Sequence, residues 1–270
     1  MQKLTRDDVI RFVQQHYVPD GITLAAAGNL DHDTIVEQAQ DALWSLSGSR
    51  VDLPRQACGF ERGVSVEASP YRQAYFALGI RSNPYAHGDR YRQFVLNSIL
   101  GGGMSSRLFR ELRESRGLVY GIQSEYHGYR DGGLLVIEGS TAPEQLMQVL
   151  ALTMMELYRL DSSERPIDEE ELWTARMQIR GQHLLAAENT HTRMSRLATQ
   201  HFYFDRQVAE TEVLQEIAAI DLEGIQNYVD RTFVPSLGDV SVAVVGPDAA
   251  ECFNESSIRE LMADFQGISV

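Results

Sequence analysis

A pattern of capped helix, aromatic-Val-Pro and apolar strand occurs twice in this chain, once near each end, and it constrains the fold more than any other feature. In the first copy, a helix that Thr5 can cap leads to Tyr17-Val18-Pro19 and then to the apolar run Ile22–Gly28. In the second copy, a helix that begins near Ile220 leads to Phe233-Val234-Pro235 and then to Val240–Gly246. Two unrelated helix–strand units could have the same capping and turn residues, but the common order and spacing favour a duplicated unit.

The duplication predicts how the chain divides into domains. A new pattern begins at Val64, so residues 64–250 are expected to form one complete domain that ends in the second copy, within the usual size range of a domain. Little sequence precedes the first copy, so residues 1–50 are expected to be the C-terminal end of a homologous first domain, most of which lies outside this sequence. Residues 51–63 have no hydrophobic period and are interpreted as a linker, and residues 251–270 as a helical tail.

The periodicity of apolar residues predicts an α+β fold. Short apolar or alternating runs predict strands at Ile22–Ala27, Val64–Ala68 and Gln73–Arg81. Two further runs, Leu118–Tyr126 and Leu134–Ser140, are expected to pair with each other. Helical spacing dominates most of the chain after these strands. We therefore expect tandem homologous domains with a mostly antiparallel sheet packed by helices, the first domain being incomplete.

Charge and cysteine usage limit the classes of partner. The 270 residues include 38 Asp and Glu against 24 Lys and Arg, which gives a formal net charge of -14. This sign disfavours binding to nucleic acid, and it suits either solubility or the attraction of basic peptides. The longest apolar runs are too short to span a membrane. The two cysteines, Cys58 and Cys252, show no spacing that suggests a disulfide or a Cys-x-x-Cys motif. This points to a reducing, cytoplasmic location.

One long stretch carries a family resemblance. Residues 100–120 are LGGGMSSRLFRELRESRGLVY, and they closely resemble the second-domain signature of the pitrilysin/insulinase family of zinc metallopeptidases, especially its processing-peptidase branch. Tyr17-Val18-Pro19 and Ala26–Asp33 resemble the segment that ends the first domain in that family. The resemblance covers nearly the whole chain. It implies tandem α+β domains and the proteolysis of peptides.

The resemblance also implies roles for two residues. In the family an Arg and a Tyr, seven residues apart in the domain after the zinc-bearing one, complete the active site, and Arg113 and Tyr120 match this pair. Gly117 is expected to cap the helix of Arg113 in a left-handed conformation, so one tight turn could present both side chains to a cleft. Arg113 would then anchor a peptide carbonyl or carboxylate, and the Tyr120 hydroxyl would stabilise a tetrahedral oxyanion. Spacing alone would instead favour an exposed helix-end arginine and a half-buried strand tyrosine.

A glycine triplet opens the same stretch. Gly101-Gly102-Gly103 lacks the Gly-Lys-Ser/Thr ending of a phosphate loop and follows a helix rather than a strand, so it is interpreted as a turn between helices. The noncatalytic processing-peptidase subunit has a glycine-rich substrate loop in this general region. By that resemblance, Gly101, Gly102 and Gly103 are candidates for substrate binding.

The zinc motif of the family is absent from this sequence. The family binds zinc through His-x-x-Glu-His and a distant Glu, and none of the seven histidines stands in that arrangement. Glu188 and His191 have the spacing of a helical ligand pair, but such a pair on an acidic helix is usually a solvated face. We therefore expect no metal ligands and no cofactor in this chain, and zinc in the missing portion of the first domain.

Three functional hypotheses follow from these observations. In the first, the chain is the C-terminal part of a zinc metalloendopeptidase and contributes substrate-binding and transition-state residues to a zinc domain absent here, so that it is inactive alone. In the second, it is a noncatalytic subunit that binds peptides together with a zinc-bearing protomer, as a homodimer or heterodimer. In the third, it is a stand-alone domain with no connection to peptidases.

Overall fold

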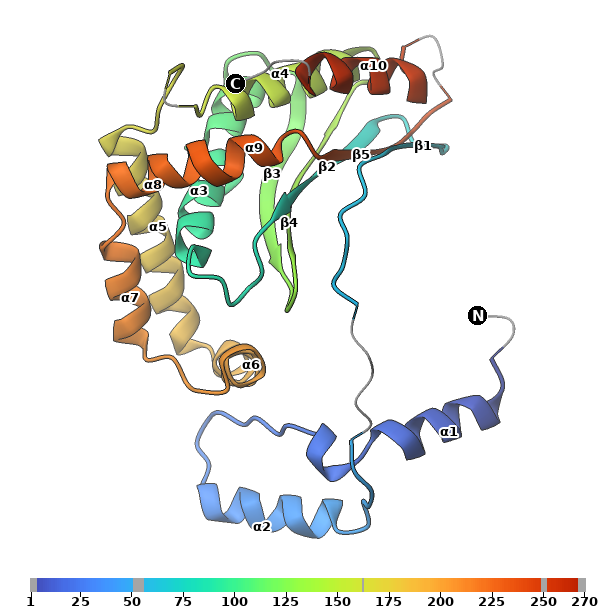
Figure 1. The fold of residues 1–270 in the computed structure, drawn as a ribbon, viewed down its shortest axis with the longest axis vertical. Coiled ribbons are helices and arrows are strands. Elements are labelled where there is room, and N and C mark those ends of the chain that lie inside the picture. Colours follow the sequence, from blue (N-terminus) through green and yellow to red (C-terminus); the bar gives the residue numbers. More distant parts are fainter. Residues whose placement is uncertain (1–3, 51–55, 162, 249–251, 267–270) are drawn as a thin grey trace. The chain divides into compact units, whose positions relative to one another are not determined.

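The chain forms two compact units, each of which combines segments that are distant in sequence. The computed structural model describes residues 4–50, 56–161, 163–248 and 252–266 (Figure 1). Unit 1 comprises Met1–Gln56 and Leu184–Gln207, and unit 2 comprises Ala57–His183 and Val208–Val270. Parts of the predicted linker and tail, namely residues 51–55, 251 and 267–270, lie outside the described residues. Unit 1 includes a segment from within the predicted domain 64–250, so the domain boundaries stay a prediction.

Unit 2 is built on a five-stranded mixed sheet. The strands lie in the order β1-β5-β2-β4-β3. Their bounds are Val64–Ala68 (β1), Ala74–Ser82 (β2), Val119–Gly128 (β3), Gly133–Thr141 (β4) and Val240–Gly246 (β5). Only β1 and β5 are parallel, and the other three neighbouring pairs are antiparallel. The predicted α+β fold with a mostly antiparallel sheet is confirmed, including the pairing of the two strands on either side of residues 128–133.

Helices pack on one side of this sheet. They are α3 (Arg90–Gly101), η2 (Phe109–Glu114), η3 (Pro143–Gln145), α4 (Leu146–Tyr158), α5 (Glu169–Glu188), α7 (Glu210–Ala218), α8 (Leu222–Tyr228), η4 (Val229–Phe233), α9 (Val234–Ser236) and α10 (Glu255–Gln266). Figure 1 shows α3, α5 and α8 on the same side of the strands. Alternate strand residues point to opposite sides, so β2 buries Phe76, Leu78 and Ile80 while Tyr75 and Arg81 stay exposed. We call the side that carries Tyr75 the open face.

Unit 1 has helices with uncovered apolar faces. It contains α1 (Arg6–His16), η1 (Pro19–Gly21), α2 (His32–Leu43) and α6 (Thr190–Phe204). The predicted cap of α1 is confirmed, because Thr5 and Asp8 form a reciprocal capping box. Neither α1 nor α2 has a buried residue, and the side chains of Phe12 and Trp44 are 58% and 88% exposed. These helices are therefore locally well specified but lack the packing that normally stabilises an amphipathic helix.

The predicted strand at Ile22–Ala27 is wrong for the described structure. The described residues of unit 1 contain no strand, and Ile22–Ala27 has no strand assignment. Its counterpart in the second copy, β5, lies between β1 and β2 and forms hydrogen bonds with both. A strand needs neighbours for its backbone N–H and C=O groups, and unit 1 supplies none among the residues described. The two copies also differ at aromatic-Val-Pro, because Val234-Pro235 continues as the short helix α9.

A buried ion pair fastens the helical segment of residues 107–114 to the start of α5. Arg107 is 3% exposed. Its Nε and Nη2 donate to the two carboxylate oxygens of Glu171 at 2.7 and 2.6 Å. Its Nη1 and Nη2 also donate to the carbonyls of Arg165 and Pro166 at 2.9 and 3.0 Å. The guanidinium group thus binds the carboxylate through two parallel hydrogen bonds and uses most of its other donors on backbone carbonyls. This is the favourable geometry for a buried charge.

The end of α3 packs closely against β3 because of its glycines. A Cβ on Gly101 would lie 2.5 Å from the backbone nitrogen of Ser124, and one on Gly102 would lie 2.7 Å from the Cα of Ser98. A Cβ on Gly103 would meet only the side-chain amide of Gln178, at 3.2 Å. Gly101 therefore allows the close approach of α3 to β3, Gly102 lies against the preceding turn of its own helix, and Gly103 faces the hydrogen-bonded side chain of Gln178.

Arg107→Ala should lower the free energy of unfolding of unit 2 by about 3 kcal/mol, because it leaves the Glu171 carboxylate without its charged partner. Urea denaturation followed by far-UV circular dichroism measures this change. Arg116→Ala is the matched control, because it removes an exposed ion pair with Glu111 and should cost less than about 1 kcal/mol. Equal effects of the two substitutions would contradict the structural role of Arg107.

Gly101→Ala should destabilise unit 2 by about 1–3 kcal/mol, because the added methyl group meets strand backbone that cannot move independently of the sheet. Gly103→Ala should cost less than Gly101→Ala, because the added methyl group meets a side-chain amide at 3.2 Å rather than strand backbone at 2.5 Å, although Gln178 is itself hydrogen-bonded to Gly102 and Ser98. Thermal unfolding of both variants tests this difference. A Gly103→Ala variant as unstable as Gly101→Ala would show that the local packing is described incorrectly.

Candidate functional site

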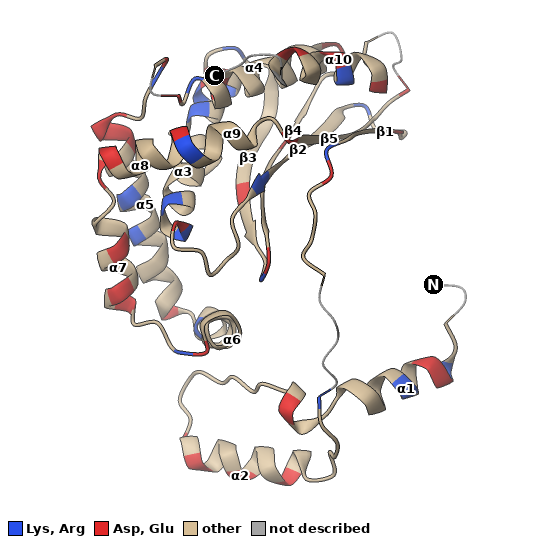
Figure 2. Ribbon diagram, in the orientation of Figure 1, with Lys and Arg blue, Asp and Glu red and all other residues tan. Residues whose placement is uncertain are grey.

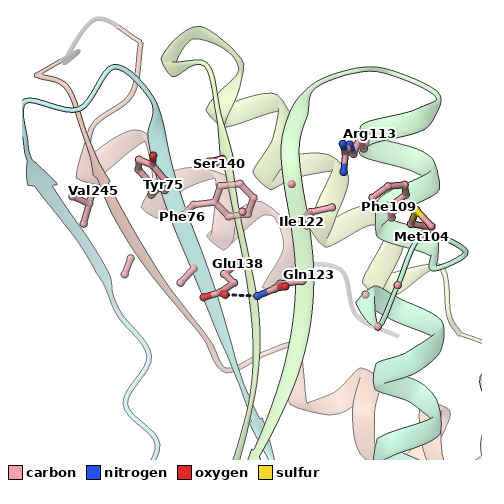
Figure 3. A pocket seen from close by; sticks show the side chains of 17 residues that line it. Tyr75, Phe76, Met104, Phe109, Arg113, Ile122, Gln123, Glu138, Ser140 and Val245 are labelled. Carbon is pink, nitrogen blue, oxygen red and sulfur yellow. Dashed lines mark hydrogen bonds between the residues drawn. The ribbon is translucent and has the colours of Figure 1, made fainter. Parts of the chain in front are cut away.

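A cavity of about 690 Å³ on unit 2 is lined both by residues of the open face and by residues of the helical side, such as Phe76 and Gly101. Its floor includes Tyr75, Ala77 and Glu138, and its wall includes Gly101–Met104 and the η2 helix (Figure 3). All of the lining residues belong to unit 2. The cavity therefore combines residues of the signature 100–120 with the sheet surface that no helix of unit 2 covers.

Arg113 lies in the wall of this cavity. It is in η2, which is a π-helix, a rare form that occurs frequently at functional sites. The predicted cap after this helix is confirmed, because Gly117 has φ 63°. The Arg113 guanidinium lies over the ring of Phe109, with its Cζ 4.9 Å from the ring centroid. Its side chain is exposed, and it forms no ion pair with a carboxylate of the described residues. It thus presents an uncompensated positive charge to the cavity.

Tyr120 lies on the strand beside the cavity. The pairing of β3 with β4 shifts between Val119 and Gly121, so Tyr120 is an extra residue in a β-bulge. Its side chain is 66% exposed. Gly121 lines the cavity, but Tyr120 itself is not among the lining residues. The bulge re-aims this tyrosine relative to a regular strand, which the sequence alone did not indicate. Bulges of this kind are over-represented next to active sites.

Gly101, Gly102 and Gly103 also line the cavity. The structure therefore brings the glycine triplet and Arg113 to one site, as their proximity in the signature would allow. The absence of side chains at these positions has the packing role described above and also leaves the cavity wall open. Their participation in substrate binding, like the catalytic roles of Arg113 and Tyr120, stays a prediction.

A carboxylate that no sequence motif indicates also lines this cavity. Glu138 of β4 faces Gln123 of β3 across the open face, and Gln123 Nε2 donates to Glu138 Oε1 at 2.6 Å (Figure 3). Glu138 and Arg113 are the only charged residues among those lining the cavity. Alternation along residues 134–140 could have placed Glu138 on the outer face of its strand, but only the register between strands brings it to this cavity.

The described residues hold no candidate metal centre. Nowhere among them do three or more His, Cys, Asp or Glu side chains gather in a way that could hold a metal ion. The residues present therefore do not fit the zinc site that the family resemblance implies. Among the same described residues, no helix combines the length and the apolar composition that crossing a lipid bilayer requires.

Comparison with known proteins identifies relatives over most of the chain. Residues 3–179 match the family model described as the peptidase M16 inactive domain. An uncharacterized zinc protease of Streptomyces coelicolor is 32% identical over 232 residues, which are 83% of this chain and 50% of the relative. An uncharacterized zinc protease of Rickettsia felis is 30% identical over 251 residues, which are 92% of this chain and 59% of the relative. The chain thus spans between half and three-fifths of these relatives.

Solved structures share the fold at lower identity. The peptidase M16 inactive domain from Pseudomonas fluorescens superposes with a TM-score of 0.78 at 17% identity, over 92% of this chain and 58% of that one. A chain of complex III from Candida albicans gives a TM-score of 0.80 at 17% identity, over 97% of this chain and 63% of that one. The family model, the sequence relatives and the shared fold together confirm the resemblance of residues 100–120. This chain belongs to the M16 family of zinc peptidases and corresponds to its C-terminal part, which the matching model describes as the inactive domain.

Proposed function

We propose that this chain is the C-terminal part of a zinc metalloendopeptidase, in which it binds the peptide substrate and contributes Arg113 and Tyr120 to a zinc-bearing domain. The observation that carries the proposal is the uncompensated guanidinium of Arg113 in a cavity lined in part by the open face of the sheet. A peptide offers this group a backbone carbonyl or a carboxylate, both of which accept the paired donors of arginine. The cavity of about 690 Å³ has the size typical of a binding site for a small ligand or a short part of a peptide.

In this proposal, Tyr120 has the complementary chemical task. Its hydroxyl can donate a hydrogen bond to the oxygen that becomes negative when a peptide carbonyl is attacked. A donor that is fixed before the reaction lowers the barrier more than one that must reorient. The β-bulge places Tyr120 outside the regular pairing of β3 with β4, and its side chain is exposed to a ligand. Arg113 would orient the peptide and Tyr120 would stabilise the charge.

The exposed apolar faces of unit 1 support the proposal that residues 1–50 end a homologous first domain. Apolar residues in α1 and at the end of α2 that would pack in a complete domain, such as Phe12 and Trp44, are exposed here. By the repeat, Ile22–Gly28 corresponds to β5, which has one parallel and one antiparallel neighbour. We therefore expect Ile22–Gly28 to become an interior strand when the rest of that domain is present.

The alternative is a noncatalytic subunit that binds peptides beside a zinc-bearing protomer of the same family. The match to a model described as an inactive domain favours it, because such a domain need not belong to the polypeptide that carries the metal. The two proposals share the same peptide site and the same requirement for a zinc-bearing partner. They differ in whether that partner is linked covalently, as part of one polypeptide, or associates as a separate chain.

Arg113→Ala and Tyr120→Phe should each lower kcat for cleavage of an unfolded peptide by about 100-fold in the assembly of this chain with its zinc-bearing domain or subunit. The chain alone should show no cleavage that is sensitive to a chelator. Arg110→Ala and Tyr129→Phe are the matched controls, since both residues are exposed and lie outside the cavity lining. Unchanged kcat in both site variants would refute the proposed roles.

Backbone amides of residues 22–28 should exchange hydrogen rapidly in the chain alone, because they have no strand partner. In the assembly they should become protected to a degree similar to that of β5, since the missing neighbours would then be present. Hydrogen exchange followed by mass spectrometry measures both states, with residues 240–246 as the internal reference. Equal exchange of residues 22–28 in the two states would contradict the idea of a completed first domain.

A further inference from the structure

We propose that Glu138 is a specificity-determining residue that selects a basic side chain, Lys or Arg, in the bound peptide. This inference rests on the proposed function, because it concerns the peptide that occupies the same cavity. Arg113 and Glu138 present opposite charges from different elements, the η2 helix and strand β4 (Figure 3). A peptide can satisfy both at once, with a backbone carbonyl at Arg113 and a cationic side chain at Glu138.

The strand register places Glu138 beside open space. Gln123, Glu138, Ala77 and Ala243 lie opposite one another in neighbouring strands, and all four line the cavity. The two alanines have short side chains, so they leave room above the sheet next to the carboxylate. A long basic side chain can lie across this floor with its methylene groups on the apolar lining and its charge at Glu138.

The carboxylate is held by one neighbour and available to another. Gln123 Nε2 donates to Oε1 at 2.6 Å, which restricts the rotation of the Glu138 side chain. Among the described residues, no protein group donates to Oε2 and no cation forms an ion pair with Glu138. A guanidinium or ammonium group from a ligand would therefore complete a charge-assisted hydrogen bond without displacing a protein partner.

Carboxylates outnumber arginine and lysine side chains on the open face of the strands. The five strands carry three carboxylates, Glu67, Glu125 and Glu138, and a single Arg or Lys, which is Arg81 (Figure 2). The register puts all four on the open face, and Arg81 lies opposite Leu134, about 13 Å along the strand from the row of Glu138. Arg81 therefore does not neutralise Glu138, and the charges on the strands favour a cation, while the one cationic residue of the cavity lining, Arg113, lies on the η2 wall.

An aromatic ring on the same floor adds to the preference. Tyr75 lines the cavity, is 47% exposed and is the diagonal neighbour of Glu138 across β2 and β4. Diagonal neighbours on one face are within reach of aromatic and long side chains. The face of a tyrosine ring attracts a guanidinium or ammonium group by a cation–π interaction. Glu138 and Tyr75 together thus offer a carboxylate and an aromatic surface to the same cation.

Peptide binding to the full chain tests this inference. A fluorescein-labelled unfolded peptide with one arginine is compared with the same peptide carrying citrulline, which keeps the shape and removes the charge. Fluorescence anisotropy should show that the chain binds the arginine peptide about fivefold more tightly. Glu138→Gln should abolish this preference while leaving the affinity for the citrulline peptide within about twofold. Because Glu138 is exposed and the replacement has the same shape, the variant should keep the native circular dichroism spectrum.

Glu125→Gln is the matched control, since it removes a carboxylate from the same face at a position outside the cavity lining. It should retain the preference for arginine. The inference is overturned by any of three results: no binding or no preference in the unaltered chain, a preference that survives Glu138→Gln, or an equal loss with Glu125→Gln. A negative result in this binding test would not refute the proposed function, because that proposal is tested separately by the effect of Arg113→Ala and Tyr120→Phe on kcat.

Discussion

The sheet of unit 2 is packed by the helices of this unit on one side only, and the rest of the structure depends on this asymmetry. Strand alternation sends Phe76, Leu78 and Ile80 into the helical layer, where their burial stabilises the unit. The same alternation leaves Tyr75, Ala77 and the strand carboxylates on the open face. The buried Arg107–Glu171 pair then holds the helical segment of residues 107–114 against α5, so that η2 forms a fixed wall beside that face.

Local patterns in the sequence predicted the parts of the fold that depend on local chemistry. The Thr5–Asp8 capping box, the left-handed Gly117 and the pairing across residues 128–133 each follow from neighbouring residues. The strand expected at Ile22–Ala27 is not formed. An apolar run indicates only that a segment can become a strand, whereas a strand also needs neighbouring strands for its backbone hydrogen bonds. Arg107 was missed for a related reason: its partner Glu171 is 64 residues away, and no periodicity connects the two.

The residues of the candidate site also differ in whether a local sequence pattern predicts them. Arg113, Tyr120 and the glycine triplet were found through the signature 100–120, which is continuous in sequence. Glu138 was missed, because its proximity to the cavity arises from the register of β2, β4 and β5 rather than from any motif. The resulting cavity has one positive and one negative residue at its lining, Arg113 and Glu138.

The most direct test of the central claim is an experimental structure of this chain assembled with its zinc-bearing domain or subunit and an uncleaved peptide. We expect the peptide to cross the open face of the sheet, with the Arg113 guanidinium and the Tyr120 hydroxyl within about 3 Å of peptide oxygen atoms, the Tyr120 contact being to the carbonyl at the metal. A peptide bound at the metal with both side chains remote from it would contradict the account.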